Sequence, residues 1–277
     1  MKKFKVGIQL YGVRGAMAED FVGTLKAVRD MGYEYVEFAG FYDRTAEEIK
    51  SILDELGLKC ISVHQKLDPY EKDPEAMIAF LKKIGVKYNV IPWYERSRLA
   101  GTEGWDDTVK KFKEASALLE KNGMKLGYHN HDFEFETHEG KYLFDYILEA
   151  LGDGIEPELD TCWVHYAGLD PVAKLRELRG RAMIVHLKDF KCDRLAGGPT
   201  YDLIDENGKP IKTTREENNF EFTPLGRGRQ NFAEILAACE DAGCEVVIVE
   251  QDKTYGGMSE LEAAKIARDY LKNNFGI

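Results

Sequence analysis

The chain has 277 residues and a formal net charge of -11 at pH 7, with 49 acidic residues against 38 lysines and arginines. This charge argues against a nucleic acid as partner, because affinity for phosphates comes from clustered basic groups that release counterions. Hydrophobic residues make up 44% of the chain and charged residues 31%, which is typical of a globular protein with a sizeable core. No Pro/Ser-rich linker divides the sequence, so we expect a single domain over residues 1–277.

The sequence shows no pattern of a targeting or membrane segment. Residues 1–10 begin with basic side chains but lack a long apolar stretch and a small-residue cleavage site. We therefore expect a cytoplasmic protein that makes no membrane contact. An odd number of cysteines without CxxC spacing indicates neither a disulfide framework nor a thiolate zinc site. These cysteines are Cys60, Cys162, Cys192, Cys239 and Cys244.

Short apolar or β-branched runs alternate with longer amphipathic runs along the chain. The short runs predict eight strands, at residues 5–10, 35–39, 60–64, 88–93, 125–130, 155–159, 183–187 and 246–250. The longer runs predict helices at residues 21–31, 46–56, 74–84, 105–121, 142–151, 171–178, 232–242 and 260–274. Several helices should end at a glycine directly before a strand, as in ELGLKCISV and DAGCEVVIV.

Eight β–α units with short connections predict an α/β fold, and in particular a closed (β/α)8 TIM barrel. An open doubly wound sheet is the structural alternative, but no GxGxxG follows the first strand. One connection departs from the rhythm, because residues 192–230 form a long polar segment after the seventh strand. We expect this loop to overhang the mouth of the barrel as a lid or binding loop. Oligomeric state stays open, since the outer helices of barrels often pair in dimers or tetramers.

Polar side chains gather at the predicted C-terminal ends of the strands, where barrel enzymes carry their reactive groups. Carboxylate and imidazole groups from neighbouring strands suit a divalent cation such as Mn, Mg, Co or Zn. Each residue alone has a simpler interpretation, since His64 or His129 could be a core histidine and Asp160 could cap the next segment. The joint pattern points to a metal, because Asp160, His186 and Glu250 on successive strands would otherwise bury unbalanced charge.

The order of the motifs resembles the sugar phosphate isomerase/epimerase superfamily, the xylose-isomerase-like TIM barrels. The motifs are GIQLYGVR, YHNHDFEF, ELDTCW, VHLKD, PLGRGRQNF and VIVEQD, between Gly7 and Asp252. The resemblance implies a Mn-type cation held by Asp160, His186, Glu250 and a ligand from the fifth strand. Many relatives carry Glu-Asn-His there, whereas this chain reads His129-Asn130-His131 and offers Glu134 slightly later. We assign the metal to Glu134, Asp160, His186 and Glu250, with His129 as the alternative to Glu134.

A cation beside a carbonyl stabilises the enediolate that forms when a base removes the neighbouring C–H proton. We expect a metal-dependent isomerase or epimerase of a sugar or keto-sugar. The alternative is a lyase or dehydratase of 3-keto-glycosides or inososes, since a two-glutamate proton shuttle would lack one member here. A non-catalytic sugar-binding barrel is a further alternative. A nuclease with the same barrel is disfavoured by the acidic charge.

Specific roles follow from the same strand ends. The candidate acid–base residues are Glu250, His129, His131 and Lys188. Lys188 either faces the substrate or forms a salt bridge to Asp189 or Glu134. Four further residues are assigned to the substrate: Glu37, His64, Trp93 and Asp189. Phosphate is not expected on the substrate, because the sequence has no Gly-rich P-loop and offers Gly226-Arg227-Gly228 as its compact Gly/Arg candidate.

Overall fold

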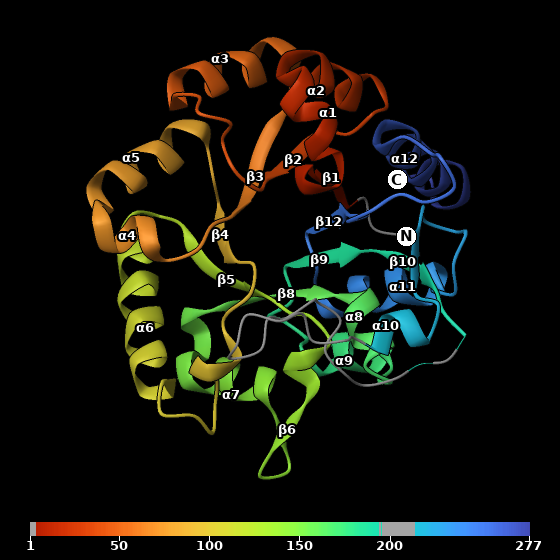
Figure 1. The fold of residues 1–277 in the computed structure, drawn as a ribbon. Coiled ribbons are helices and arrows are strands. Elements are labelled where there is room, and N and C mark those ends of the chain that lie inside the picture. The colour runs from red at the N-terminus through yellow and green to blue at the C-terminus, as the bar shows by residue number, and fades with distance from the viewer. Residues whose placement is uncertain (1–3, 194, 196–213) are drawn as a thin grey trace.

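The computed structural model describes residues 4–193, 195 and 214–277, which contain a closed eight-stranded parallel barrel. Around the barrel the strands follow the order β1-β12-β9-β8-β5-β4-β3-β2 (Figure 1). Their bounds are β1 Lys5–Gln9, β2 Tyr35–Phe38, β3 Lys59–His64, β4 Tyr88–Ile91, β5 Lys125–His129, β8 Glu156–Asp160, β9 Ile184–Leu187 and β12 Val246–Val249. The predicted TIM barrel is confirmed, and with it the closure of the first strand onto the last.

Helices surround the barrel as an outer ring (Figure 1). They are α1 Arg14–Glu19, α2 Phe21–Asp30, α3 Ala46–Leu56, α4 Asp68–Lys72, α5 Pro74–Ile84, α6 Trp105–Lys121, α7 Leu143–Leu151, α8 Thr161–Tyr166, α9 Pro171–Glu177, α10 Thr214–Glu217, α11 Phe232–Ala242 and α12 Glu260–Phe275. None of the helices in these described residues is long and apolar enough to span a bilayer.

The helix boundaries have local chemical causes, as α3 illustrates. Its first turn is closed by a capping box in which the Thr45 hydroxyl accepts from the Glu48 N–H and the Glu48 carboxylate accepts from the Thr45 N–H. Its last turn ends at Gly57, whose φ of 67° is the left-handed conformation that glycine adopts at little cost. The glycine–strand pattern therefore located this helix end correctly.

Apolar side chains fill the lower part of the barrel. Alternate residues of a strand face the same side, so Val246 and Ile248 share a face with Glu250. The two apolar residues belong to a separate buried cluster with Ile61, Tyr88, Val90 and Ile184. Beyond this apolar cluster, toward the C-terminal ends of the strands, the inward-facing residues are polar. A second and larger apolar core lies between the barrel and the helices, and it includes Leu25, Ile49, Phe112 and Leu236.

The sixth barrel strand is displaced by one residue from its predicted place. It runs over Glu156–Asp160 rather than 155–159, and α8 follows without a loop. Asp160 is thus both the last strand residue and the N-cap of α8. The short α8 was not predicted, because TCWVHY is too brief to show a helical period.

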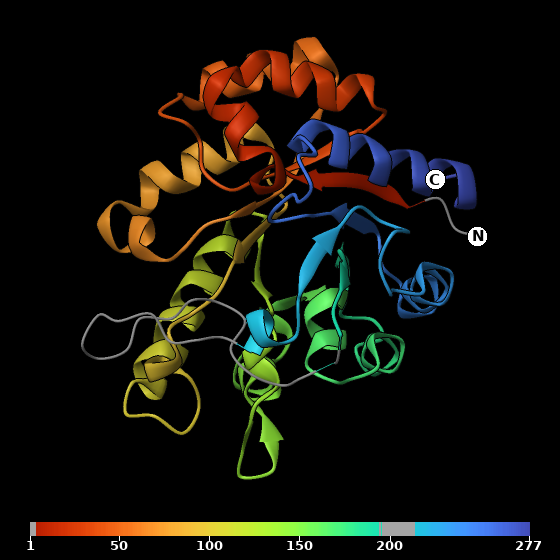
Figure 2. The same cartoon turned by 45° about the vertical axis from the view of Figure 1, so that its right-hand side comes forward.

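The connections on the mouth side contain small elements of their own. β6 Thr137–His138 and β7 Lys141–Tyr142 form a hairpin that projects from the body (Figure 2). Three 3-10 turns add to these: η1 Leu10–Val13, η2 Arg96–Arg98 and η3 Phe133–Phe135; a further turn, η4 Gly152–Gly154, lies between α7 and β8 on the opposite side of the barrel. In the long connection after β9, β10 Asp189–Lys191 pairs antiparallel with β11 Glu221–Thr223. The predicted lid at residues 192–230 falls partly outside the described residues, since 194 and 196–213 are not among them.

Candidate metal centre and active site

Buried histidines and carboxylates meet at the C-terminal ends of the barrel strands, in two groups that share His186. We call His129, Asp160, His186 and Glu250 the outer group, because Asp160 and Glu250 lie at or beyond the ends of their strands. We call Glu37, His64, Glu158 and His186 the inner group, in which Glu158 lies two residues before Asp160 on the same strand. Each group brings four potential ligand atoms within 4.8 Å of one another.

In the outer group the ligand atoms converge on two carboxylate oxygens. His129 Nε2 lies 3.4 Å from Asp160 Oδ2 and 3.7 Å from Glu250 Oε2. His186 Nδ1 lies 2.9 Å from the same Glu250 oxygen. Ligands that each sit 2.0–2.2 Å from one ion stand roughly 3 to 3.5 Å apart, so these separations suit a divalent cation. Neither nitrogen of the buried His129 ring has a hydrogen-bond partner within the described residues, so the donor set of this ring fits a role as a metal ligand.

Asp160 divides its two oxygens between structure and site. Oδ1 accepts from the backbone N–H groups of Cys162 and Trp163 and so caps α8. Oδ2 faces the outer group. The backbone N–H of Asp160 is bound by the Asn130 side-chain oxygen at 3.0 Å, which ties β5 to β8. The sequence offered helix capping and metal binding as alternative roles for Asp160. Its two carboxylate oxygens allow both roles at once.

The inner group holds the other face of His186. His186 Nε2 lies 2.9 Å from Glu37 Oε1 and 3.2 Å from Glu158 Oε2. His64 Nε2 approaches the same two oxygens, at 3.1 Å and 2.6 Å. A histidine that binds a metal through one nitrogen commonly donates its other N–H to a carboxylate, which fixes the ring. The inner group thus directs Nδ1 of His186 toward the outer group.

Lys188 provides the positive charge nearest to the outer group. Its ammonium lies 3.0 Å from Asp160 Oδ2, 2.8 Å from Glu250 Oε2 and 3.1 Å from Asp252 Oδ1, with only 1% of the side chain exposed. These partners differ from the Asp189 and Glu134 considered in the sequence. The four carboxylates of the two groups and Asp252 carry five negative charges when all are ionised, whereas Lys188 and the three imidazoles supply four positive charges at most. A divalent cation suits this surplus.

Burial and charge act in opposite directions on the pKa values here. Burial opposes the charged form of His129, but Asp160 and Glu250 outweigh it and raise the pKa of this imidazole to about 9. Burial also opposes ionisation of Glu250, yet Lys188 and His186 hold the pKa of this carboxyl well below its usual value. His131 differs, because burial and the charges of His129 and Lys188 lower its pKa well below the usual range. His131 is therefore neutral.

Glu134 lies apart from the outer group. Its Oε1 accepts from the Tyr128 hydroxyl at 2.8 Å and its Oε2 from the His131 N–H at 2.8 Å. Burial raises the pKa of this carboxyl to about 8 despite those hydrogen bonds. Of the two candidates for the fifth-strand ligand, the structure brings His129 rather than Glu134 beside Asp160 and Glu250.

The four residues assigned to the substrate have different surroundings. Glu37 lies fully buried, where it accepts from Gln9 Nε2 at 2.6 Å and from the Ser62 hydroxyl. His64 joins it in the inner group. Trp93 lies on the rim, 38% exposed, with the Lys66 ammonium 3.5 Å from its ring centre. Among these four, Trp93 has the most exposed side chain.

Asp189 is engaged by backbone groups. Its carboxylate accepts from the N–H groups of Phe190, Gly226, Gly228 and Gln230 at 2.8–3.1 Å. A Cβ at position 228 would lie 2.2 Å from Asp189 Oδ1, so glycine is required there for the loop to close on the carboxylate. The Gly226-Arg227-Gly228 segment thus donates backbone N–H groups to the carboxylate of Asp189.

Three functional candidates escaped the sequence assignment. Glu158 was detectable, since a residue two before Asp160 on a strand faces the same side. Asp252 lies in the VIVEQD motif but received no role, and Gln9 lies in GIQLYGVR. Asp252 follows Glu250 by two residues and so had the same kind of signal, whereas Gln9 is brought beside Glu37 only by the pairing of β1 with β2.

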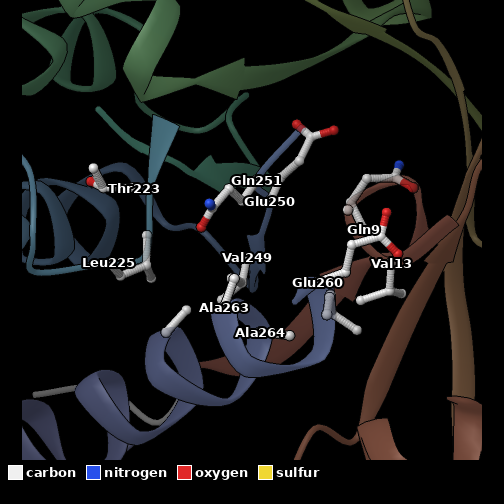
Figure 3. Close-up of a pocket in the computed structure, with 13 residues that line it drawn as sticks. Gln9, Val13, Thr223, Leu225, Val249, Glu250, Gln251, Glu260, Ala263 and Ala264 are labelled. Atoms are coloured by element: carbon white, nitrogen blue, oxygen red, sulfur yellow. The ribbon is translucent and has the colours of Figure 1, made fainter. Parts of the chain in front are cut away.

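A small cavity of about 10 Å³ lies between the barrel and α12 (Figure 3). Gln9 and Glu250 line one side of it, and Ala263 and Ala264 of α12 line the opposite side. Most of its remaining wall is apolar, including Ile8, Val13, Leu225, Val249 and Ala267. The cavity therefore borders the outer group through Glu250.

The chain is a TIM barrel with a mixed nitrogen and oxygen cluster of potential metal ligands at its mouth, and the comparisons narrow the class of protein. The sequence profile of the xylose isomerase-like TIM barrel family matches residues 25–274. The chain belongs to this family. The resemblance inferred from the motifs is thereby confirmed.

The curated relatives of the chain include two kinds of protein. The rhizopine catabolism protein MocC of Rhizobium meliloti is 26% identical over 275 residues, covering 88% of this chain and 80% of that protein. An inosose dehydratase of Clostridium beijerinckii is 26% identical over 277 residues, covering 91% of this chain and 89% of that protein.

Solved structures agree on the fold. A sugar phosphate isomerase/epimerase of Parabacteroides distasonis superposes with a TM-score of 0.75 at 23% identity, covering 97% of this chain and 98% of that one. The IolI protein, solved with a zinc atom bound, has a TM-score of 0.68 at 18% identity, covering 99% of this chain and all of that one. At these identities both likenesses concern the fold alone.

Proposed function

We propose that the chain is a metal-dependent enzyme that eliminates a β leaving group, water in the simplest case, from a keto-polyol such as an inosose or a 3-keto-glycoside. The cation, Mn in our assignment, would be held by the outer group, with His129 as the ligand from β5. A bound divalent ion polarises a ketone and so acidifies the neighbouring C–H bond. The relatives named as inosose dehydratases support this reaction class.

The observation that carries the proposal is an unequal acid–base pair beside the outer group. Lys188, 2.8 Å from Glu250 Oε2, is a cationic donor, and His131, whose ring centre lies 4.9 Å from that of His129, is a neutral acceptor because burial lowers its pKa. Elimination needs this inequality, since one group must take the C–H proton and another must give a proton to the departing oxygen.

His131 and Lys188 carry the two protons that move in the elimination. His131 takes the proton from the carbon next to the ketone, and the electron pair of that C–H bond forms the new C=C bond. The C–O bond at the β carbon breaks as Lys188 gives its proton to the departing oxygen, which leaves as water or an alcohol. Trp93 at the rim offers an apolar face to the ring of the substrate.

Isomerisation or epimerisation, our expectation from the sequence, is the second candidate. The observation that favours it is that Glu250 and His131 are both proton acceptors near the same cluster. Against it stands Glu134, whose carboxylate is bound by Tyr128 and the His131 N–H rather than presented to the outer group. A two-carboxylate shuttle therefore lacks its member on β5.

The test is to incubate Mn-loaded enzyme in D2O with inososes, 3-keto-glycosides and ketoses and to follow each by NMR. Elimination predicts loss of the leaving group with a new unsaturated product. Deuterium at the α carbon with retained substituents would instead establish the second candidate. If no compound exchanges its α proton and none loses a group, while metal is bound, the enzymatic proposal is refuted.

A further inference from the structure

The ammonium of Lys188 forms ion pairs with the same carboxylate oxygens that the outer group would offer to a metal. Its ammonium lies 3.0 Å from Asp160 Oδ2, and this is also the oxygen that faces His129. It lies 2.8 Å from Glu250 Oε2, the oxygen that faces both His129 and His186. The ammonium is thus centred on the two carboxylate oxygens that a cation would need.

A dication bound to those oxygens would compete with the ammonium directly. Metal–oxygen bonds in such sites are about 2.1 Å long, so an ion on both oxygens would lie within a few ångströms of a like charge. In a buried site this repulsion is weakly screened, because water is largely excluded. Lys188 must therefore either weaken metal binding or move when metal binds.

The structure offers the ammonium a second position close by. Both oxygens of Asp252 already lie near Lys188 Nζ, at 3.1 Å and 3.3 Å. Asp252 belongs to neither the outer nor the inner group. The ring centres of Trp163 and Phe222 lie 4.9 Å and 5.5 Å from the same ammonium, so aromatic faces also stabilise the cation. A short shift from Asp160 and Glu250 toward Asp252 would preserve its charge pairing.

We propose that Lys188 is an exchangeable counter-ion, which neutralises Asp160 and Glu250 in the metal-free enzyme and passes to Asp252 when a divalent cation binds. This inference rests on the proposed function, because it requires a cation at the outer group. It gives Lys188 two roles in sequence. The ammonium first prevents bare carboxylates from repelling one another, and after metal loading it is released to act on the substrate.

The direct test measures Mn²⁺ affinity by competition with a chelating dye. Lys188→Met removes the charge but keeps the length of the side chain, and we expect it to bind Mn²⁺ about tenfold or more tightly than the native chain. The matched control is Lys253→Met, which removes an exposed lysine next to Asp252 and should leave the affinity within about twofold. An affinity for Lys188→Met equal to or weaker than that of the native chain would overturn the proposal.

A double-mutant cycle tests the role of Asp252. Asp252→Asn should weaken Mn²⁺ binding, because Lys188 then loses its alternative partner. In the Lys188→Met background the same substitution should have a much smaller effect. If Asp252→Asn weakens Mn²⁺ binding equally in both backgrounds, Asp252 acts only through its own charge. Lys188 then does not move to Asp252 when metal binds.

A structure of the native chain crystallised with Zn²⁺ answers the question even if Lys188→Met fails to fold. We expect the ammonium to contact Asp252 and to have left Asp160 and Glu250. An ammonium still within hydrogen-bond distance of Asp160 in the loaded site would refute the exchange. A native chain that takes up no divalent cation would refute the proposed function instead, so the two failures are distinguishable.

Discussion

The outer and inner groups are built from the same kinds of side chain and share His186, yet their surroundings differ. The inner carboxylates are held by fixed donors: Glu37 accepts from Gln9, Ser62 and His186, and Glu158 lies against His64. In the outer group Glu250 also lies against His186 Nδ1, but Asp160 Oδ2 and Glu250 Oε2 face the Lys188 ammonium and His129, a histidine that makes no hydrogen bond within the described residues. The hydrogen-bonded carboxylates of the inner group hold the ring of His186 in place. The carboxylates of the outer group are balanced by the ammonium of Lys188, which a metal ion can replace.

The largest effect is expected from removing one charge of the outer group while keeping the fold. Asn is as good an N-cap as Asp, so Asp160→Asn should still cap α8 but lose its metal ligand. We expect loss of bound metal and a fall in kcat/KM of at least about a thousandfold. Metal analysis and kinetics measure the two effects.

The control for this change is Asp170→Asn. Asp170 caps α9 through the Val172 N–H as Asp160 caps α8, but it lies away from both groups. Metal content and rate should remain those of the native chain. If Asp160→Asn retains its full metal content, the outer group is not the metal site.

A smaller effect is expected from the inner group. Glu158→Gln keeps the size of the side chain but weakens its hold on His186 and His64, and we expect metal affinity to fall about 10- to 100-fold without complete loss. Titration with Mn²⁺ measures it. Glu156→Gln is the matched control, since Glu156 lies two residues earlier on β8 and accepts from the Met183 N–H at the opposite end of the barrel. Complete loss of metal in Glu158→Gln would place the ion in the inner group and reverse the comparison.

The smallest effect concerns Glu134, the carboxylate that belongs to neither group. Its pKa is raised from 4.5 to about 8, so the folded state keeps a proton that the unfolded chain loses as the pH rises. Stability should therefore fall between about pH 4.5 and 8, by up to about 1.4 kcal/mol per pH unit for one proton. Glu134→Gln should lack this slope, and urea unfolding at several pH values with a chelator present measures it.

The control for Glu134 is Glu136→Gln, on the same segment but in a surface pair with Arg96. It should retain the pH slope of the native chain. A slope that persists unchanged in Glu134→Gln would show that the buried carboxyl is ionised in the folded state, and would return Glu134 to consideration as a metal ligand.

The sequence alone determined the barrel and most of the outer group. Period-two runs, amphipathic helices and glycine helix ends are local signals, because backbone preferences and hydrophobic spacing act over a few residues. Since parallel strands in a closed barrel end at one face, Asp160, His186 and Glu250 had to approach one another once the order of strands was known. The family resemblance followed from the same motifs.

Only the tertiary structure decided how each side chain is used. His129 and Glu134 are five residues apart, and the choice between them depends on Tyr128 and the His131 N–H, which hold the Glu134 carboxylate. Lys188 finds its partners on β8 and after β12, and Asp189 finds its partners in a loop nearly 40 residues away. Hydrogen bonds and ion pairs act over about 3 Å, so their partners are fixed by distances that arise only when the barrel closes.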